Sequence, residues 1–168
     1  MEKIKVGGVM QSEGRALVRV LSVPDRPGVA GALLSVLGRN GINIELLVES
    51  ADMEDCGNFT ICIDQKDLGA ALGVLESVKN SIDAKGISYV PDVAVLSVFG
   101  PHLREKPRVP GVMFNALASS GINIAAISTS ISSVSCVIEA SYLDDAVRAL
   151  NDAFEIPFLQ VKKRPRDY

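Results

Sequence analysis

The residues best suited to chemistry lie in the loop VPDRPG, residues 23–28, which runs into a segment of helical periodicity. Apolar residues recur there every three or four positions, which predicts a helix over about 27–40. The first turn of a helix leaves backbone N–H groups without intrahelical acceptors, and the helix dipole favours an anion at this end. The sequence therefore predicts a carboxylate-binding site at the N–H groups of Gly28, Val29 and Ala30.

Two polar side chains near this loop add charge and hydrogen-bonding capacity. Asp25 can pair with an ammonium group, or cap the helix by accepting backbone N–H bonds. Asn43 lies at the start of the next expected strand, where its amide offers both donors and acceptors. Together with the helix N-terminus they form a candidate site for a small zwitterion. The same residues fit a simple helix-initiating turn in which Asn43 only holds the backbone, and their types alone do not decide between the two.

Groups for catalysis are hard to find in this sequence. The one histidine, His102, lies in a loop with no expected carboxylate or serine partner, and phosphate-loop and zinc-protease motifs are missing. The acidic turn of Asp52, Glu54 and Asp55 is typical of a solvated surface loop rather than a cation site. We therefore expect no catalytic residue, no metal and no cofactor, and no enzyme activity of this chain on its own.

Composition narrows the possible classes further. The 168 residues carry a net charge of −3 with a pI of about 5.2, which argues against a nucleic-acid-binding surface. The start, MEKIKVGG, lacks the apolar run of a signal peptide, and no apolar stretch has the length of a membrane span. Cys56, Cys62 and Cys136 lack metal-binding spacing, and the last two lie in apolar strands. These features predict free thiols in a reducing cytoplasm.

An internal repeat sets the expected organisation. Eight of the eighteen positions 27–44 are identical to the positions eighty residues later, including GINI at 41–44 and again at 121–124. Such an ungapped match indicates a duplication and hence two units of roughly 70–80 residues. Units this small bury little core by themselves, so we expect them to pack on each other or on a second chain.

Each repeat predicts a β-α-β-β-α-β order. In the first unit, strands are expected at 15–23, 42–50, 59–63 and 84–90, with helices at 27–40 and 67–82. Asp67 is expected to cap the second of these helices. An additional strand, 3–10, precedes the unit as one arm of a hairpin with a turn at 12–14. In the second unit, strands are expected at 93–99, 122–130, 133–140 and 157–161, with helices at 108–120 and 142–153.

The predicted fold class is α+β, with two tandem ferredoxin-like units. Each unit is an antiparallel four-stranded sheet with two helices on one face, and the two sheets are expected to pair side by side. The expected domains are an N-terminal hairpin strand at 1–14, a first unit at 15–90, a second unit at 91–162 and a basic tail at 163–168. Strand 3–10 and segment 157–162 fit either unit.

The motifs VPDRPGVA…GINIELLVES and SVFGPHLREKP…MFNALASSGINIAAISTS resemble the tandem ACT regulatory region of aspartokinases over about residues 4–156. This resemblance implies a homodimer assembled through ACT units, with an amino-acid effector, typically lysine or threonine, bound where units meet. Effector binding would alter the activity of an aspartokinase catalytic domain or subunit, which this chain lacks. No nucleic-acid or membrane partner is implied.

The resemblance also implies effector contacts, residue by residue. Asp25 matches the loop aspartate of the family, and Val29 and Ala30 match its loop backbone. The matched strand positions are Asn43, Ile44 and Glu49 in the first unit, and Asn123, Ile124, Ser128 and Thr129 in the second.

Three departures from the family pattern affect this assignment. Glu49 and Ser50 stand where the family often has Gln-Asn, and the added carboxylate suits a cationic effector such as lysine. In the second unit, Arg108 replaces a common glycine and Pro110 removes an N–H donor. We therefore expect one competent loop site per chain, at 25–30. A structural module that dimerises a partner and binds no ligand is the alternative interpretation.

Overall fold

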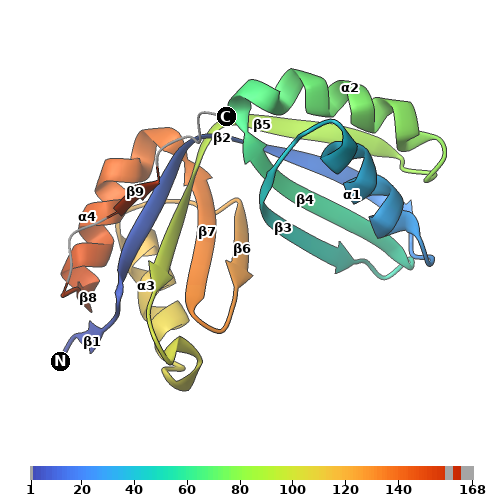
Figure 1. Ribbon diagram of the computed structural model, residues 1–168. Coiled ribbons are helices and arrows are strands. Elements are labelled where there is room, and N and C mark those ends of the chain that lie inside the picture. Colours follow the sequence, from blue (N-terminus) through green and yellow to red (C-terminus); the bar gives the residue numbers. More distant parts are fainter. Residues whose placement is uncertain (1, 158–160, 164–168) are drawn as a thin grey trace. The chain divides into compact units, whose positions relative to one another are not determined.

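The computed structural model describes residues 2–157 and 161–163 (Figure 1). The chain divides into two compact units. The central unit comprises residues 15–91. The split unit comprises the residues up to Gly14 together with those from Asp92 onward, so its sequence is interrupted by the central unit.

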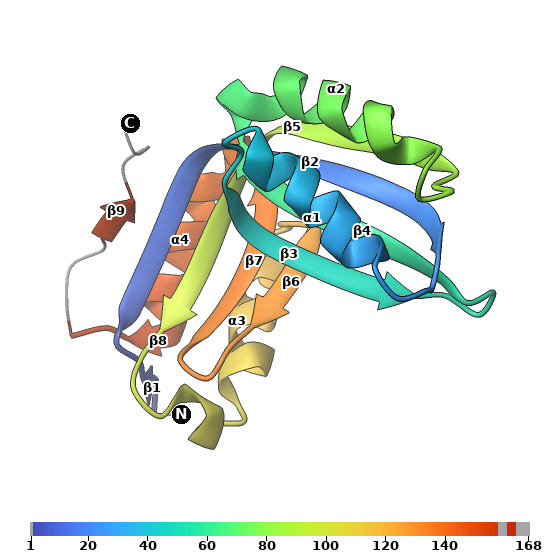
Figure 2. The same cartoon turned by 45° about the vertical axis from the view of Figure 1, so that its right-hand side comes forward.

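The central unit is a four-stranded sheet with strand order β3-β4-β2-β5. Its elements are part of β2 (Gly8–Pro24), α1 (Val29–Arg39), β3 (Ile44–Ala51), β4 (Cys56–Asp64), the short 3-10 helix η1 (Gln65–Asp67), α2 (Leu68–Lys79) and part of β5 (Gly86–Phe99). Both helices cover one face of the sheet (Figure 2). Between helices and sheet lies an apolar core that includes Val18, Val20, Val29, Leu33, Leu37, Ile61, Ile63 and Leu75. The order β-α-β-β-α-β predicted for this unit is confirmed.

The split unit repeats the arrangement with strand order β2-β5-β7-β6. Its further elements are β1 (Ile4–Lys5), η2 (Leu103–Glu105), α3 (Val109–Ser119), β6 (Ala126–Thr129), β7 (Ser133–Glu139), η3 (Ala140–Tyr142), α4 (Leu143–Ala153), β8 (Phe154–Glu155) and β9 (Val161–Lys163). Its core includes Leu96, Val98, Val109, Met113, Leu117, Ile138, Leu150 and Phe154. β1 pairs with β8, and β9 pairs with β2, both in parallel.

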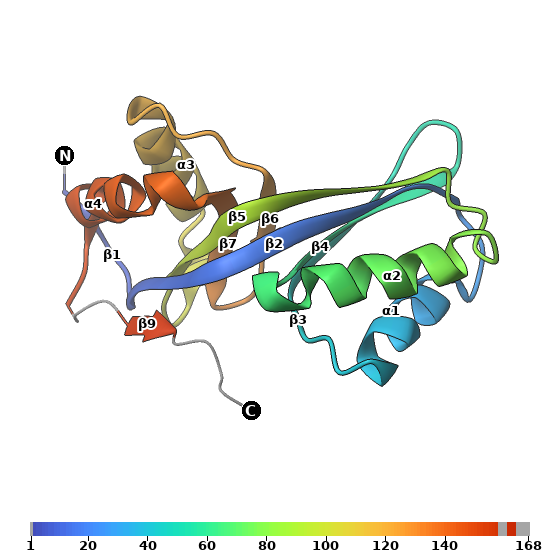
Figure 3. The ribbon, with the colours of Figure 1, turned by 90° about the horizontal axis from the view of Figure 1, so that it is seen from above.

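The hairpin predicted at the N-terminus is wrong. β2 runs without interruption from Gly8 to Pro24, although Gly14 has a left-handed φ of 66°. One left-handed glycine bends a strand without reversing it, and no second turn residue follows. β5 likewise continues through Pro91, where the sequence predicts two strands. In each unit, a stretch of β2 lies beside a stretch of β5 (Figure 3).

This continuity decides which strand completes each sheet. In the split unit the N–H of Gly7 donates to the carbonyl of Phe99 over 2.7 Å, and in the central unit the N–H of Lys85 donates to the carbonyl of Leu21 over 3.0 Å. The residues before Gly14 therefore belong with the second repeat. Residues 158–160 of the strand predicted at 157–161 are not among the described residues. Val161–Lys163 form β9, so the first residue of the predicted basic tail, Lys163, belongs to a strand. Residues 164–168 of that tail also lie outside the described residues.

Of three smaller predictions, two need correction and one is confirmed. The strand predicted at 122–130 is shorter, because β6 begins only at Ala126. Asp67 occupies the N-cap position of α2, but its side chain forms no cap hydrogen bond. Instead, Asp64 accepts the N–H of Lys66 at the preceding turn.

Cys62 and Cys136 are buried free thiols as predicted, and burial raises the pKa of each to about 12. Among the described residues, no helix is long and apolar enough to cross a membrane.

Candidate functional site

The loop that precedes α1 is built around one left-handed residue. Gly28, the N-cap of α1, has φ 95°, a conformation that residues with a Cβ rarely adopt. The first helical hydrogen bond runs from the N–H of Ala32 to the carbonyl of Gly28 over 2.9 Å. The N–H groups of Ala30 and Gly31 lie ahead of this bond, where helix geometry supplies no acceptor. The N–H of Val29, which was predicted to be free, instead donates to the carbonyl of Arg26 over 3.4 Å. The donors available at the start of α1 are therefore the N–H groups of Ala30 and Gly31, only the first of which was predicted.

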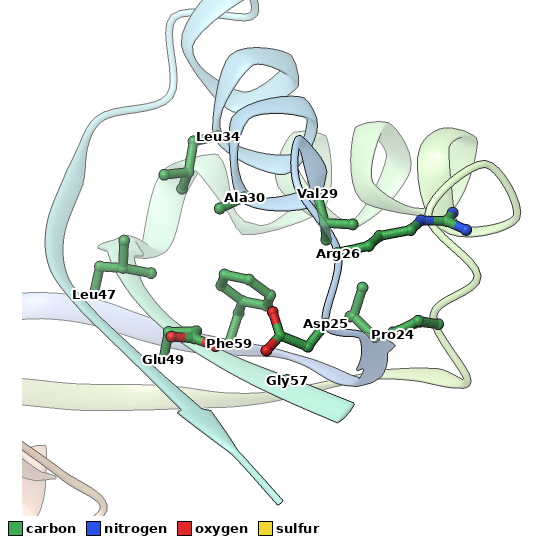
Figure 4. Close-up of a pocket in the computed structure, with 11 residues that line it drawn as sticks. Pro24, Asp25, Arg26, Val29, Ala30, Leu34, Leu47, Glu49, Gly57 and Phe59 are labelled. Atoms are coloured by element: carbon green, nitrogen blue, oxygen red, sulfur yellow. The ribbon is translucent and has the colours of Figure 1, made fainter. Parts of the chain in front are cut away.

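Asp25 does not cap the helix. Among the described residues, no side chain forms a cap hydrogen bond at the N-terminus of α1, so the structure does not support the capping role considered for Asp25. The backbone N–H of Asp25 instead donates to the carbonyl of Asp55 over 2.9 Å, which ties the loop to the β3–β4 hairpin. Its carboxylate is exposed and points over the sheet (Figure 4).

A pocket of about 240 Å³ opens between this loop, the first turns of α1 and the ends of β3 and β4. It lies wholly within the central unit. Its lining residues are Val23, Pro24, Asp25, Arg26, Val29, Ala30, Leu34, Leu47, Glu49, Gly57 and Phe59. Sites for drug-sized ligands usually span about 300–1,000 Å³, so this pocket suits a smaller molecule such as a free amino acid.

The charge of the pocket comes from two carboxylates. Figure 4 shows the carboxylates of Asp25 and Glu49 directed into the space over β4. Arg26 also borders the pocket, but its guanidinium binds elsewhere: Nη2 lies 2.9 Å from a carboxylate oxygen of Asp83 and 3.3 Å from the carbonyl of Ser81. The one cation of the lining is therefore paired outside the pocket. The resulting negative charge favours a ligand with one or more ammonium groups.

Apolar side chains form the opposite wall. Val29 and Phe59 are buried, and they are joined by Leu34 and the partly exposed Leu47. Phe59 packs against the helices in the core of the central unit. Because Phe59 and Glu49 pair directly across the β3–β4 ladder, the side chain of Glu49 lies on the same face of the sheet. An apolar wall opposite two carboxylates matches a ligand that has an aliphatic stem between charged ends.

Gly57 lines the pocket where the pocket passes over β4, and it is not among the site residues predicted from the sequence. A Cβ built on Gly57 would lie 3.2 Å from Oε1 of Glu49 and 3.6 Å from the Phe59 ring. The sequence predicts a strand only over 59–63, whereas β4 already begins at Cys56. The available signal was a glycine directly before an alternating strand, a position that often marks close approach of a ligand or a neighbouring group.

The structure brings together only part of the predicted set. Asp25, Val29, Ala30 and Glu49 line the pocket, and Gly28 adjoins it as the helix cap. Asn43 is exposed and precedes β3, and Ile44 is the first residue of β3; neither is among the lining residues.

The other predicted residues belong to the split unit. Asn123 and Ile124 lie in the segment between α3 and β6, whereas Ser128 and Thr129 lie in β6 itself. None of the four borders the pocket of the central unit.

The loop of the split unit differs in its contacts. Arg108, at the position equivalent to Gly28, has ordinary helical backbone angles (φ −80°) and forms no side-chain cap. Pro110 occupies the first turn of α3, where it has no N–H to donate. Lys106 turns its Nζ to the carbonyl of Lys5, 2.7 Å away. These residues tie the loop to the N-terminal segment of the same unit.

Two sequence expectations about reactive groups are modified by the structure. His102 does have a carboxylate neighbour, since its Nδ1 lies 3.4 Å from Oε1 of Glu105, but both side chains are exposed. In the acidic turn, the carboxylate of Asp52 accepts the N–H groups of Glu54 and Cys56, and thus stabilises the hairpin. Within the described residues, no group of three or more His, Cys, Asp or Glu side chains is arranged to hold a metal ion.

Comparison with known proteins agrees with this architecture. ACT domain models match residues 16–80 and 96–154. The aspartate kinase of Pseudomonas putida is 33% identical over 156 residues, which are 93% of this chain and 38% of that protein. This chain thus spans well under half the length of such curated relatives.

Solved structures cover the same region. The regulatory subunit of aspartate kinase from Thermus flavus has a TM-score of 0.82 and 32% identity, covering 90% of this chain and 99% of that subunit. A structure of aspartokinase alpha and beta subunits has a TM-score of 0.81 and 30% identity, over 88% of this chain and 97% of the matched one. The chain belongs to the ACT domain family, as a tandem ACT regulatory region of the aspartokinase type.

Proposed function

We propose that this chain is an amino-acid sensor that regulates an aspartokinase, with L-lysine as effector in the pocket of the central unit. The observation that carries the proposal is the placement of two carboxylates, Asp25 and Glu49, beside the N-terminus of α1 in a pocket of about 240 Å³. The regulatory role is supported by the similarity to the regulatory subunit from Thermus flavus.

The pocket offers complementary groups for each part of lysine. The α-carboxylate binds the N–H groups at the start of α1, where the helix dipole favours an anion. The α-ammonium pairs with Asp25. The aliphatic stem lies along Leu47 and Phe59, and Glu49 accepts the second ammonium. Threonine lacks both the stem and the second charge, so it leaves Glu49 without a partner.

Regulation follows from mass action. An effector that binds one arrangement of the ACT units more tightly than another shifts the population toward that arrangement. We propose that the chain acts as a homodimer assembled through its ACT units, in the cytoplasm, and on a catalytic domain or subunit of an aspartokinase. The three free thiols of Cys56, Cys62 and Cys136 suit that reducing compartment. The chain itself is proposed to be non-catalytic.

The test is a binding panel on the purified chain by calorimetry and thermal shift. L-lysine is compared with L-threonine, with L-norleucine, which keeps the stem but lacks the second ammonium, and with cadaverine, which lacks the carboxylate. A ligand at 100 times its dissociation constant stabilises the folded state by about 2.7 kcal/mol. We expect lysine to bind most tightly and the other three to bind at least about tenfold more weakly.

The variant Asp25→Asn keeps the shape of the loop but removes its charge. We expect it to weaken lysine binding about tenfold or more, since a charge-assisted hydrogen bond contributes about 1.5–3 kcal/mol. Asp67→Asn is the matched control, because the side chain of Asp67 makes no cap bond at α2. If no amino acid binds the wild-type chain while it remains a dimer, the alternative role of an assembly module without ligand replaces the sensor.

A further inference from the structure

The backbone conformation of β4 at Gly57 does not require a glycine. Its φ lies outside the left-handed region, unlike those of Gly14, Gly28, Gly41 and Gly121, so any residue adopts its conformation. Glycine in the interior of a strand weakens the strand, because it costs more conformational entropy and contributes no side chain to packing. The reason for a glycine here must therefore lie in the space above it.

That space is occupied by neighbouring groups of the pocket. In the β3–β4 ladder Glu49 pairs with Phe59 and Ala51 pairs with Gly57, so the Glu49 side chain reaches Gly57 diagonally. A Cβ at residue 57 would lie 3.2 Å from Oε1 of Glu49, tighter than an ordinary contact, and 3.7 Å from the carbonyl of Val23. The carboxylate of Glu49 thus rests on the bare backbone of β4.

The position of this carboxylate decides what the pocket can bind. Val23 on β2 pairs with Gly57, and Asp25 follows two residues later, so Gly57 lies between the strand that carries Glu49 and the loop that carries Asp25. Figure 4 shows both carboxylates turned toward the space over this residue. A Cβ at residue 57 would require the Glu49 carboxylate to shift away from β4 by a few tenths of an ångström, and thus away from the space that it shares with Asp25.

We propose that Gly57 is a specificity-determining residue that positions Glu49 and thereby holds open a subsite for the second ammonium of a diamino acid. This inference rests on the proposed function, because it assigns the selectivity of the same pocket. Gly57 makes no contact of its own with the ligand side chain. Its effect on the ligand is transmitted through Glu49. An experiment that also changes Glu49 can therefore distinguish this positioning role from a general effect of Gly57 on packing.

The experiment is a double-mutant cycle that combines Gly57→Ala with Glu49→Gln, read out as dissociation constants for L-lysine and L-norleucine by calorimetry. We expect Gly57→Ala to weaken lysine binding about tenfold while norleucine binding changes much less. In the Glu49→Gln background, the alanine at 57 should have little further effect on the lysine-to-norleucine ratio, since coupled residues are not additive. Gly73→Ala is the control, because its Cβ would meet nothing within 4 Å.

Glu49→Asp provides a variant that leaves β4 untouched. It keeps the charge but shortens the reach by one methylene, so it should reproduce the loss of selectivity of Gly57→Ala. Wild-type selectivity in Gly57→Ala, or an equal loss in both Glu49 backgrounds, overturns this inference and leaves the lysine site standing. If the wild-type chain binds no diamino acid, both the inference and the proposed function are overturned.

Discussion

The two loops that lead into α1 and α3 descend from the same repeat, yet they begin their helices in different ways. The loop of the central unit enters α1 through Gly28 at φ 95°, and a pocket with two carboxylates opens beside it. The loop of the split unit contains the 3-10 helix η2, and Arg108 enters α3 with helical angles. A duplicated sequence has therefore kept the fold of both units while the chemistry of the two loops diverged.

The difference shows which residues the fold requires and which the site requires. Leu33 and Met113, at equivalent positions, are both fully buried, so the repeat keeps a large apolar side chain there. Gly28 and Arg108 are also equivalent, but only the first has backbone angles that demand glycine. Core positions follow from packing in both units, whereas the loop positions follow from what each loop contacts.

The largest expected effect comes from truncating the shared core position. Leu33→Ala and Met113→Ala each remove a side chain with no exposed surface and should cost about 2–5 kcal/mol of unfolding free energy. Only Leu33→Ala should also weaken lysine binding, because α1 supports the pocket. Urea unfolding and calorimetry measure both quantities. Equal loss of lysine affinity in the two variants would show that the site is not confined to the central unit.

A smaller effect is expected at the helix caps. Gly28→Val forces a β-branched residue to φ 95° and should cost about 1–3 kcal/mol, with loss of lysine binding because the N–H groups of α1 move. Arg108→Val, at ordinary angles, should change stability by about 0.5 kcal/mol or less. Chemical denaturation of both variants checks the contrast. A comparable cost at the two positions would mean that the loops are equivalent after all.

The smallest expected effect concerns the buried thiols, one in each unit. Burial raises the pKa of Cys62 in β4 and Cys136 in β7 to about 12, above the ordinary value of 9.0. The unfolded thiols release their protons from about pH 9, whereas the folded ones keep theirs, so stabilisation present below pH 9 is lost as the pH rises toward 12.

Urea unfolding at pH 8 and pH 10 tests this dependence. The wild-type chain should lose on the order of 1 kcal/mol more than Cys62→Ala or Cys136→Ala between the two values. Identical pH slopes in the wild type and both variants would contradict the prediction. A different slope for Cys62→Ala alone would point to its neighbours Glu45 and Arg15, which also act on the pKa of Cys62.

The helices were predictable because each has a regular apolar stripe and clear end signals. α1 and α3 lie within two residues of the expected ranges, and Phe59, Ile61 and Ile63 are buried as their alternation predicts. The strand pairing was not predictable, since alternation shows which residues share a face but not which strands are neighbours. Gly14 and Pro91 look like breaks in the sequence, yet the chain accommodates both inside continuous strands.

The candidate site was predictable where it depends on local geometry. The loop position of Asp25 and the helix start at Val29 follow from sequence spacing, and both residues line the pocket. Gly57 and Phe59 reach it from β4 through the register of three strands, which one sequence does not reveal. Asn43, in the motif GINI after α1, was predicted to lie near the loop, but it precedes β3, is exposed and does not line the pocket.

The interrupted sequence of the split unit has a consequence for biosynthesis. Its strand before Gly14 is synthesised before residues 15–91, and all of those residues must follow before its neighbour in β5 is made. Once Pro91 has been made, the central unit has all of its own residues, so it can fold early as a unit. The strand before Gly14 then pairs with the second repeat, which is synthesised later, and this pairing carries the entropic cost of closing a long loop. Nascent-chain proteolysis should therefore find the central unit protected before the split unit.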